Sequence, residues 1–171
     1  MLLVAVAAVF TVAQGGLASS SVLRNRITAA YLAEEAMNGV KNMKDTNLLR
    51  ILNGESVNWL NGMTSCANTP CGYDVFGANG EGDLGVCSSF DQCKVKMGTY
   101  TDLTGVYRQM NASQNNPSTV DTGFVRKIYI ERTPGALQEK EAKVTVEVTR
   151  PGTDFQPFEV TSYIYNFWPA P

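Results

Sequence analysis

The chain has 171 residues, a length that fits one domain with a modest core. Its 14 basic and 16 acidic residues give a net charge of −2, so neither a basic field for nucleic acid nor a strongly acidic surface indicates a partner. Histidine is absent, which excludes Ser-His and Cys-His nucleophile pairs and removes the commonest general base and metal ligand.

The first fifty residues predict one long helix. Residues 1–13 are apolar apart from Thr11, and from Val22 a charged but periodic helical pattern continues to about Leu52. At 1.5 Å per residue such a helix is roughly 75 Å long, more than the core of a domain this size needs. We therefore expect residues 1–52 to form a stem that packs against copies of itself, with a hydrophobic part at 1–23 and an amphipathic part at 24–52.

The stem is atypical both as a signal peptide and as a membrane span. No charge precedes Arg24, and the helical pattern continues through Ala18 and Ser20, where a cleavage site would lie. The uninterrupted apolar run is about 13 residues, short of the roughly 20 that a transmembrane helix needs. Either a few leading residues are missing from this chain, or the segment spans a membrane poorly alone.

One face of the amphipathic part is rich in alanine. Small or apolar residues recur at Ala29, Ala33, Ala36, Val40 and Met43, and this spacing places them on one side of a helix. An ordinary helix lying on its own sheet would have the same pattern. We expect both arrangements, with one side on the sheet and the alanine side on neighbouring subunits.

Gly15 and Gly16 interrupt the apolar pattern of the stem. Each glycine costs about 1 kcal/mol of helix stability relative to alanine. We expect a helix break here, a weak point where the stem could unwind and stretch.

The four cysteines lie within 28 positions, at Cys66, Cys71, Cys87 and Cys93. An even, clustered set in a loop-rich region predicts two disulfides and an oxidising compartment. The alternatives are free thiols or a four-cysteine zinc site, although the spacings C-x4-C and C-x5-C are loose for zinc. Three pairings are possible, and the sequence does not choose among them.

Residues 53–171 predict a globular β head. Trp59 and Leu60 are expected to anchor the helix exit to the core, and residues 62–93 form an irregular region stapled by the disulfides. The last three predicted strands have short connections and suggest an antiparallel meander with one face covered by the stem. The fold class is therefore α+β, a long N-terminal helix on an antiparallel sheet. The predicted strands are Tyr73–Phe76, Lys94–Thr99, Val106–Gln109, Phe124–Arg132, Lys143–Arg150 and Phe158–Trp168, with a polar loop at Asn111–Thr122.

No constellation of residues predicts catalysis, a metal or a cofactor. Glu34 and Glu35 diverge on a helix, so we interpret them as a solvated face or as partners of Arg24 or Arg26 in a neighbouring subunit. Asn111 begins a glycosylation pattern that arises often by chance. A calcium site is less well supported than a solvated turn; its oxygen ligands would be Asp74, Asn79, Glu81 and Asp83. Core and sheet packing explains the aromatic end of the last strand, at Tyr163, Tyr165, Phe167 and Trp168.

The order of several segments resembles the type IV pilin and pseudopilin family, with its prepilin-type N-terminal methylation segment. The resemblance covers nearly the whole chain. The segments that carry it are Met1–Ala7, Ala30–Met37, Val40–Asn47, Gly105–Tyr107, Thr122–Ile130 and Tyr163–Trp168. Two features depart from the family pattern: no acidic residue precedes Glu34, and Gly15-Gly16 stands where a helix-breaking proline is common. If the family's opening residues precede Met1, about five are missing here.

The resemblance implies a structural subunit that is held in the cytoplasmic membrane by its stem and then moved into a helical, extracellular filament. Its implied partners are other copies of itself, other pilins and the assembly machinery, with no nucleic acid. The implied packing residues are Val4, Val9, Phe10, Val12, Leu17, Ala29 and Ala33. Two alternatives remain open. One is a minor pilin or a pseudopilin of a secretion or DNA-uptake machine, and the other is a monomeric, membrane-anchored extracytoplasmic binding domain.

Overall fold

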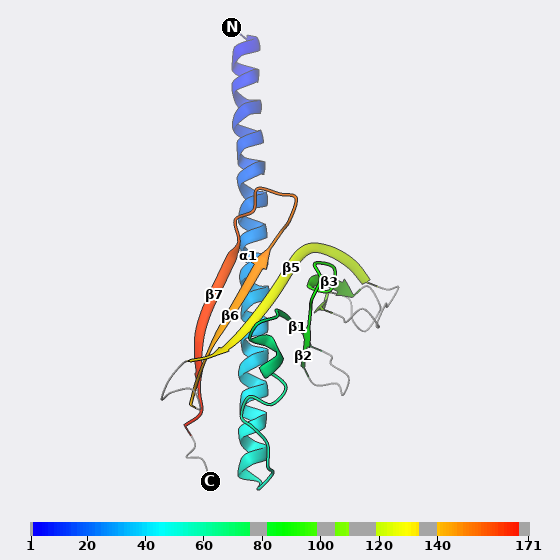
Figure 1. Ribbon diagram of the computed structural model, residues 1–171. Coiled ribbons are helices and arrows are strands. Elements are labelled where there is room, and N and C mark those ends of the chain that lie inside the picture. The colour runs from blue at the N-terminus through cyan, green and yellow to red at the C-terminus, as the bar shows by residue number, and fades with distance from the viewer. Residues whose placement is uncertain (1, 76–81, 99–104, 110–118, 134–139, 168–171) are drawn as a thin grey trace.

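One helix runs the length of the molecule, and a twisted antiparallel sheet packs against its C-terminal part (Figure 1). This computed structural model describes residues 2–75, 82–98, 105–109, 119–133 and 140–167, and only the backbone of residues 2–15, 17 and 18. The helix, α1 (Leu2–Leu52), is followed by a 3-10 turn, η1 (Thr64–Cys66). The α+β class expected from the sequence is confirmed at this coarse level.

Glycine ends α1 by a local mechanism. Gly54 has a φ of 85°, in the left-handed region that side chains avoid. Its amide donates to the carbonyl of Ile51, and the Glu55 amide donates to that of Arg50. The chain then turns back, and Trp59 and Leu60 are buried, as the sequence predicts.

Seven strands form the sheet in the described part of the chain. They are β1 (Cys71–Asp74), β2 (Asp83–Val86), β3 (Lys94–Gly98), β4 (Tyr107–Arg108), β5 (Thr119–Arg132), β6 (Glu141–Thr149) and β7 (Phe158–Tyr165). All pairs are antiparallel, and the expected meander is present, because β6 lies between β5 and β7. The other edge of β5 pairs with β3 near its start and with β1 at Ile128, and β2 and β4 extend the sheet from these strands.

Several strand boundaries differ from the expected ones. β5 begins at Thr119 and not at Phe124, since β3 supplies hydrogen-bonding partners for residues that are polar enough to look like loop. β1 begins two residues earlier than expected, at Cys71. The sequence does not predict β2, because Asp83 and Gly85 have low strand propensity. The strand forms because β1 supplies its hydrogen-bonding partners. Trp168 lies outside the described residues.

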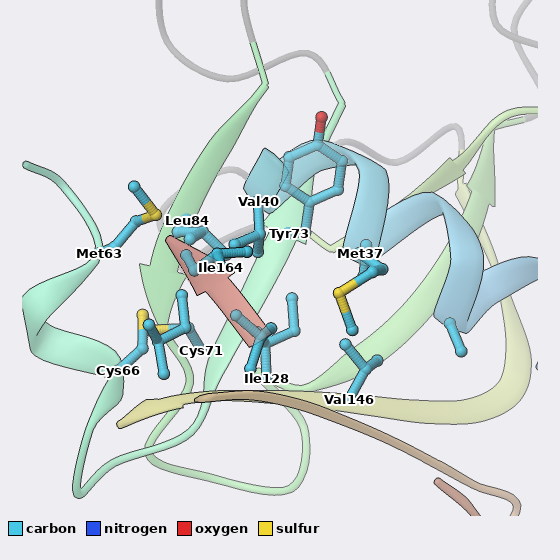
Figure 2. Packing of buried hydrophobic residues seen from close by; sticks show 14 of the residues in the cluster. Met37, Val40, Met63, Cys66, Cys71, Tyr73, Leu84, Ile128, Val146 and Ile164 are labelled. Carbon is cyan, nitrogen blue, oxygen red and sulfur yellow. A yellow bond between two sulfur atoms is a disulfide. The ribbon is translucent and has the colours of Figure 1, made fainter. Parts of the chain in front are cut away.

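The core lies between α1 and the inner face of the sheet. β6 alternates strictly, with Ala142, Val144, Val146 and Val148 fully buried. Opposite them, α1 contributes Leu32, Ala36, Met37 and Val40, while Ile128 and Ile130 of β5 and Ile164 of β7 complete the layer. Figure 2 shows Met37 and Val40 of the helix gathered with Ile128, Val146 and Ile164 of the sheet.

Candidate functional site

The N-terminal part of α1 extends beyond the sheet as a bare helix (Figure 1). Residues 19–24 of this helix are all exposed, and the first buried side chain among those described is that of Ala29. The side chains of Val4, Val9, Phe10, Val12 and Leu17 lie outside the described residues. Within the part of the chain that the structure describes, no helix has both the length and the apolar character needed to cross a membrane.

An exposed apolar stripe continues from the bare helix down the outer side of α1. It consists of Leu23, Ile27 and Tyr31, and Tyr31 is 66% exposed. Leu23, Ile27 and Tyr31 are spaced four residues apart, so they lie along one face of the helix. The stripe faces away from the core, because the buried residues of the same helix lie on the opposite side. Sequence reasoning missed it, although its spacing of four was the available signal.

Ala29 and Ala33 do not lie on an outer face. Both are fully buried in the core cluster that α1 forms with the chain's own sheet. The expectation that they pack between subunits is therefore corrected. Small side chains at these positions let the helix backbone approach β6 and β7 closely, and no surface is left for a second chain.

A buried arginine joins α1 to three parts of the sheet. Arg126 lies on β5 and its side chain is 0% exposed. It points toward the core, as do Phe124 and Ile128, which alternate with it along the strand. Its Nη1 donates to the Leu32 carbonyl at 2.9 Å and to Glu35 Oε2 at 2.6 Å, and its Nη2 donates to the Tyr73 carbonyl at 2.7 Å. Burial lowers the pKa of Arg126, and the Glu35 carboxylate opposes that shift.

Gln109 completes this network. Its Oε1 accepts from Arg126 Nε at 2.7 Å and from the Tyr73 amide at 3.0 Å. Its Nε2 donates to the carbonyls of Cys93 and Arg126, each at 2.7 Å. The side-chain amide of Gln109 thus links β1, β5 and the residue that precedes β3. No described buried side-chain nitrogen or oxygen lacks a partner.

Glu35 makes an ion pair within its own chain, with Arg126, while Glu34 stays exposed. Pairing of these carboxylates with Arg24 or Arg26 of a neighbouring subunit stays a prediction. Neither Arg126 nor Gln109 was singled out from the sequence. The signal was an arginine in the inward phase of an otherwise apolar alternation from Phe124 to Ile130.

The ring of Tyr73, on β1, has room because two of its neighbours are glycines, one on α1 and one just before β2. A Cβ at Gly39 would come within 2.3 Å of the ring, and a Cβ at Gly82 would clash with the hydroxyl. The Arg126 guanidinium lies 5.8 Å from the ring centroid. Burial raises the pKa of the Tyr73 hydroxyl, and the negative charge of Glu35 raises it further.

The four cysteines form two disulfides, as predicted, and the structure assigns the pairs. Cys66 bonds Cys71, which ties η1 to β1, and Cys87 bonds Cys93. The first bridge lies in the main core (Figure 2), and the second packs with Val125 on the other face of β5. Closing loops this short stabilises the fold by about 2 kcal/mol each in the chain-entropy estimate.

The expected break at Gly15 and Gly16 is not seen, because α1 is continuous through both residues. Glycine keeps its amide donor, so the helical hydrogen bonds continue even though stability is lower there. Unwinding of the stem under tension at this position stays a prediction.

The carboxylates considered for calcium are not arranged as a site in the described residues. Asp74 makes a bidentate pair with Arg108, at 3.0 and 2.8 Å. Asp83 faces Asp74 in the register of β1 and β2, and Asn79 and Glu81 lie outside the described residues. Among the residues that the structure places, no three acidic or cysteine side chains cluster to hold a metal ion. Asn111 also lies outside that part of the chain.

The core packing expected for the aromatic end of the last strand is not found at its described residues. Tyr163 and Tyr165 are exposed on the outer face of the sheet, and Phe167 is 83% exposed. The physical reason is the register, because Ile164 is the residue that points inward from this segment. Tyr165 and Phe167 stack on each other with ring centroids 5.6 Å apart.

Comparison of the chain with protein-family models, with curated proteins and with solved structures gives no match.

Proposed function

We propose that this chain is a structural subunit of a type IV pilus-like extracellular filament, which polymerises through α1. The observation that carries the proposal is the bare N-terminal part of α1, continuous with an exposed apolar stripe on the head-bearing part of the same helix. Among the described side chains, those of residues 19–24 and of the stripe lie outside the core. A long apolar helix that does not serve its own core is suited to packing against identical helices.

The energetics of burial support self-association through this stripe. Fully burying a large apolar side chain contributes about 1.5–3 kcal/mol, and the three stripe residues are each roughly half exposed in the isolated chain. Residues 1–13 are apolar apart from Thr11, so the apolar character of the stem sequence continues toward its start. Packing between stems in a filament, or between stem and lipid before assembly, offers similar apolar surroundings, so transfer from one to the other has a small net cost.

The attachment of the head supports a role in an assembly under load. Arg126 holds α1 to the sheet through both a carboxylate and a backbone carbonyl of the helix. The two disulfides close the segments around β1 and between β2 and β3. A force applied to the head would pass through these contacts into the stem. The proposal therefore places the stems in the filament core and the heads outside, with the cytoplasmic membrane and the assembly machinery as partners before polymerisation.

The test is a matched pair of substitutions on one helix. Leu23 and Leu49 are 60% and 61% exposed, and only Leu23 lies in the apolar stripe beside the bare stem. We expect Leu23→Asp to abolish filaments in the sheared surface fraction of the organism that encodes the chain, as seen by electron microscopy. We expect Leu49→Asp to leave filament yield near that of the wild type. Thermal unfolding of both purified variants checks that each head is folded.

Other outcomes would redirect the proposal. If the chain is a rare component of the sheared filaments, it is a minor pilin or a pseudopilin. If deletion of residues 1–23 leaves the biological function intact, the chain works as an anchored binding domain and the filament proposal is wrong.

A further inference from the structure

A groove rich in hydrogen-bond donors lies where the bare helix meets the sheet. Its volume is about 630 Å³, and it is bounded by the Ser20–Thr28 part of α1, by β3, β4 and β5, and by the residue after β6. Two of its lining residues are arginines, Arg24 and Arg150, and no carboxylate is among the described residues that line it. In a chain whose net charge is −2, this is a local excess of positive charge.

Arg150 is held in place before any ligand arrives. Its Nη1 donates to Asn25 Oδ1 at 2.7 Å, and its guanidinium lies 5.2 Å from the centroid of the Phe124 ring. Since a guanidinium carries five N–H groups, most of its donors remain available. The Asn25 side-chain oxygen is used by Arg150, which leaves the Asn25 amide nitrogen as a further donor.

Arg24 lies one helical turn from Thr28, whose hydroxyl donates to the Arg24 carbonyl at 3.0 Å. Among the residues that the structure places, no carboxylate pairs with the guanidinium of Arg24 or of Arg150 within 4.0 Å. The hydroxyl of Ser20 adds another polar group to the same wall. Two guanidinium groups, an amide and a hydroxyl form the donor set that recognises a tetrahedral oxyanion, because planar guanidinium forks match phosphate oxygens in pairs.

We propose that this groove binds a phosphate group between Arg24 and Arg150. The site stands on the geometry of the isolated chain and does not need the filament. Its natural ligand is either free phosphate or the phosphate of an anionic lipid. The lipid source alone rests on the proposed function, since the groove lies beside the base of the bare helix, where headgroups would lie if that helix entered a bilayer.

The first measurement is calorimetric titration of inorganic phosphate into the full chain, held in micelles of a neutral detergent. We expect binding by the wild type, and binding weaker by at least about tenfold in Arg24→Gln/Arg150→Gln, because each arginine removed takes away hydrogen bonds to a charged group. The matched control is Lys127→Gln/Lys143→Gln, which removes the same charge from β5 and β6 away from the groove. This control is expected to bind like the wild type.

Three results would overturn the site: no phosphate binding by the wild type, undiminished binding by the arginine variant, or an equal loss in the lysine control. Because Arg150→Gln also removes the contact with Asn25, Arg24→Gln is titrated alone and is expected to lose about tenfold with unchanged thermal unfolding. A weakening seen only in variants that also unfold at lower temperature would count against the site.

The source of the phosphate group is decided by repeating the titration with the chain in lipid nanodiscs. If phosphatidylglycerol discs abolish the binding of inorganic phosphate and phosphatidylcholine discs do not, the ligand is an anionic headgroup. If both leave the titration unchanged, the ligand is free phosphate. Filament yield is scored separately, so a failure of assembly and a failure of this site give different results.

Discussion

Arg126 and Glu35 are 91 residues apart in the sequence and form a 2.6 Å ion pair across the helix–sheet boundary. The arginine is fully buried, whereas the side chain of Glu35 is 32% exposed. The pair thus places a permanent charge inside the core and its counter-charge at the rim. A buried arginine without that counter-charge would have a large desolvation cost, so the contact fixes how α1 lies on the sheet.

Glu35→Ala should lower the free energy of unfolding by about 2 kcal/mol. Removing one partner of a fully buried pair costs about 3–5 kcal/mol, and the partial exposure of Glu35 reduces this because water can approach Arg126 once the carboxylate is gone. Glu34→Ala, at the exposed neighbouring position, should change stability by less than about 0.5 kcal/mol. Urea denaturation of both variants measures the difference. Equal effects would mean that the ion pair does not hold the helix.

Ala33→Leu should destabilise the isolated chain by about 1–3 kcal/mol, because the added carbons enter a fully packed core. The same substitution at Ala30, which is half-buried three positions earlier in the helix, should cost less. Thermal unfolding of monomeric protein reads out this effect without any filament. If Ala33→Leu unfolds like the wild type and only filament yield falls, then the alanine face does contact neighbouring subunits.

Glycine to alanine should have opposite effects at two positions of α1. At Gly39 the new methyl group would meet the Tyr73 ring, so we expect a loss of about 1–3 kcal/mol in spite of better helix propensity. At Gly16 there is open space around the added Cβ, and the stem should gain up to about 1 kcal/mol of local helix stability. Amide hydrogen exchange measures the second effect. Slower exchange around Gly16 would fit the expected weak point, and unchanged exchange would contradict it.

Tyr73 should make the protein less stable in alkali. Its pKa is raised in the folded state, above the usual value of about 10. As the pH rises past 10, the unfolded chain therefore releases its proton first, and the free energy of unfolding falls by up to about 1.4 kcal/mol per pH unit until the folded pKa is passed. Below pH 10 the contribution is fully present. The free energy of unfolding, measured by denaturation at several pH values between 8 and 11, should fall less steeply with pH for Tyr73→Phe than for the wild type. The exposed Tyr31→Phe serves as the control, and a slope equally reduced in both variants would contradict this assignment.

Local sequence patterns predicted the long helix, its end at Leu52, the valine alternation of β6 and the meander of the last three strands. Each of these depends on periodicity or on turn residues that are close together in the sequence. The presence of two disulfides also followed from the number and clustering of the cysteines. The start of β5 and the whole of β2 did not follow, since polar residues form strands there only when β3 and β1 supply the partners.

The sequence by itself predicted one helix to about Leu52, longer than the core of this head needs. Only the tertiary structure decided which of its faces the head uses. Ala29 and Ala33 turn inward, while Leu23, Ile27 and Tyr31 remain outside. The physical reason is that helical periodicity defines faces but not their partners. Arg126 fixes which face of α1 packs on the sheet, because its buried charge is stable only where Glu35 and the Leu32 carbonyl can bind it.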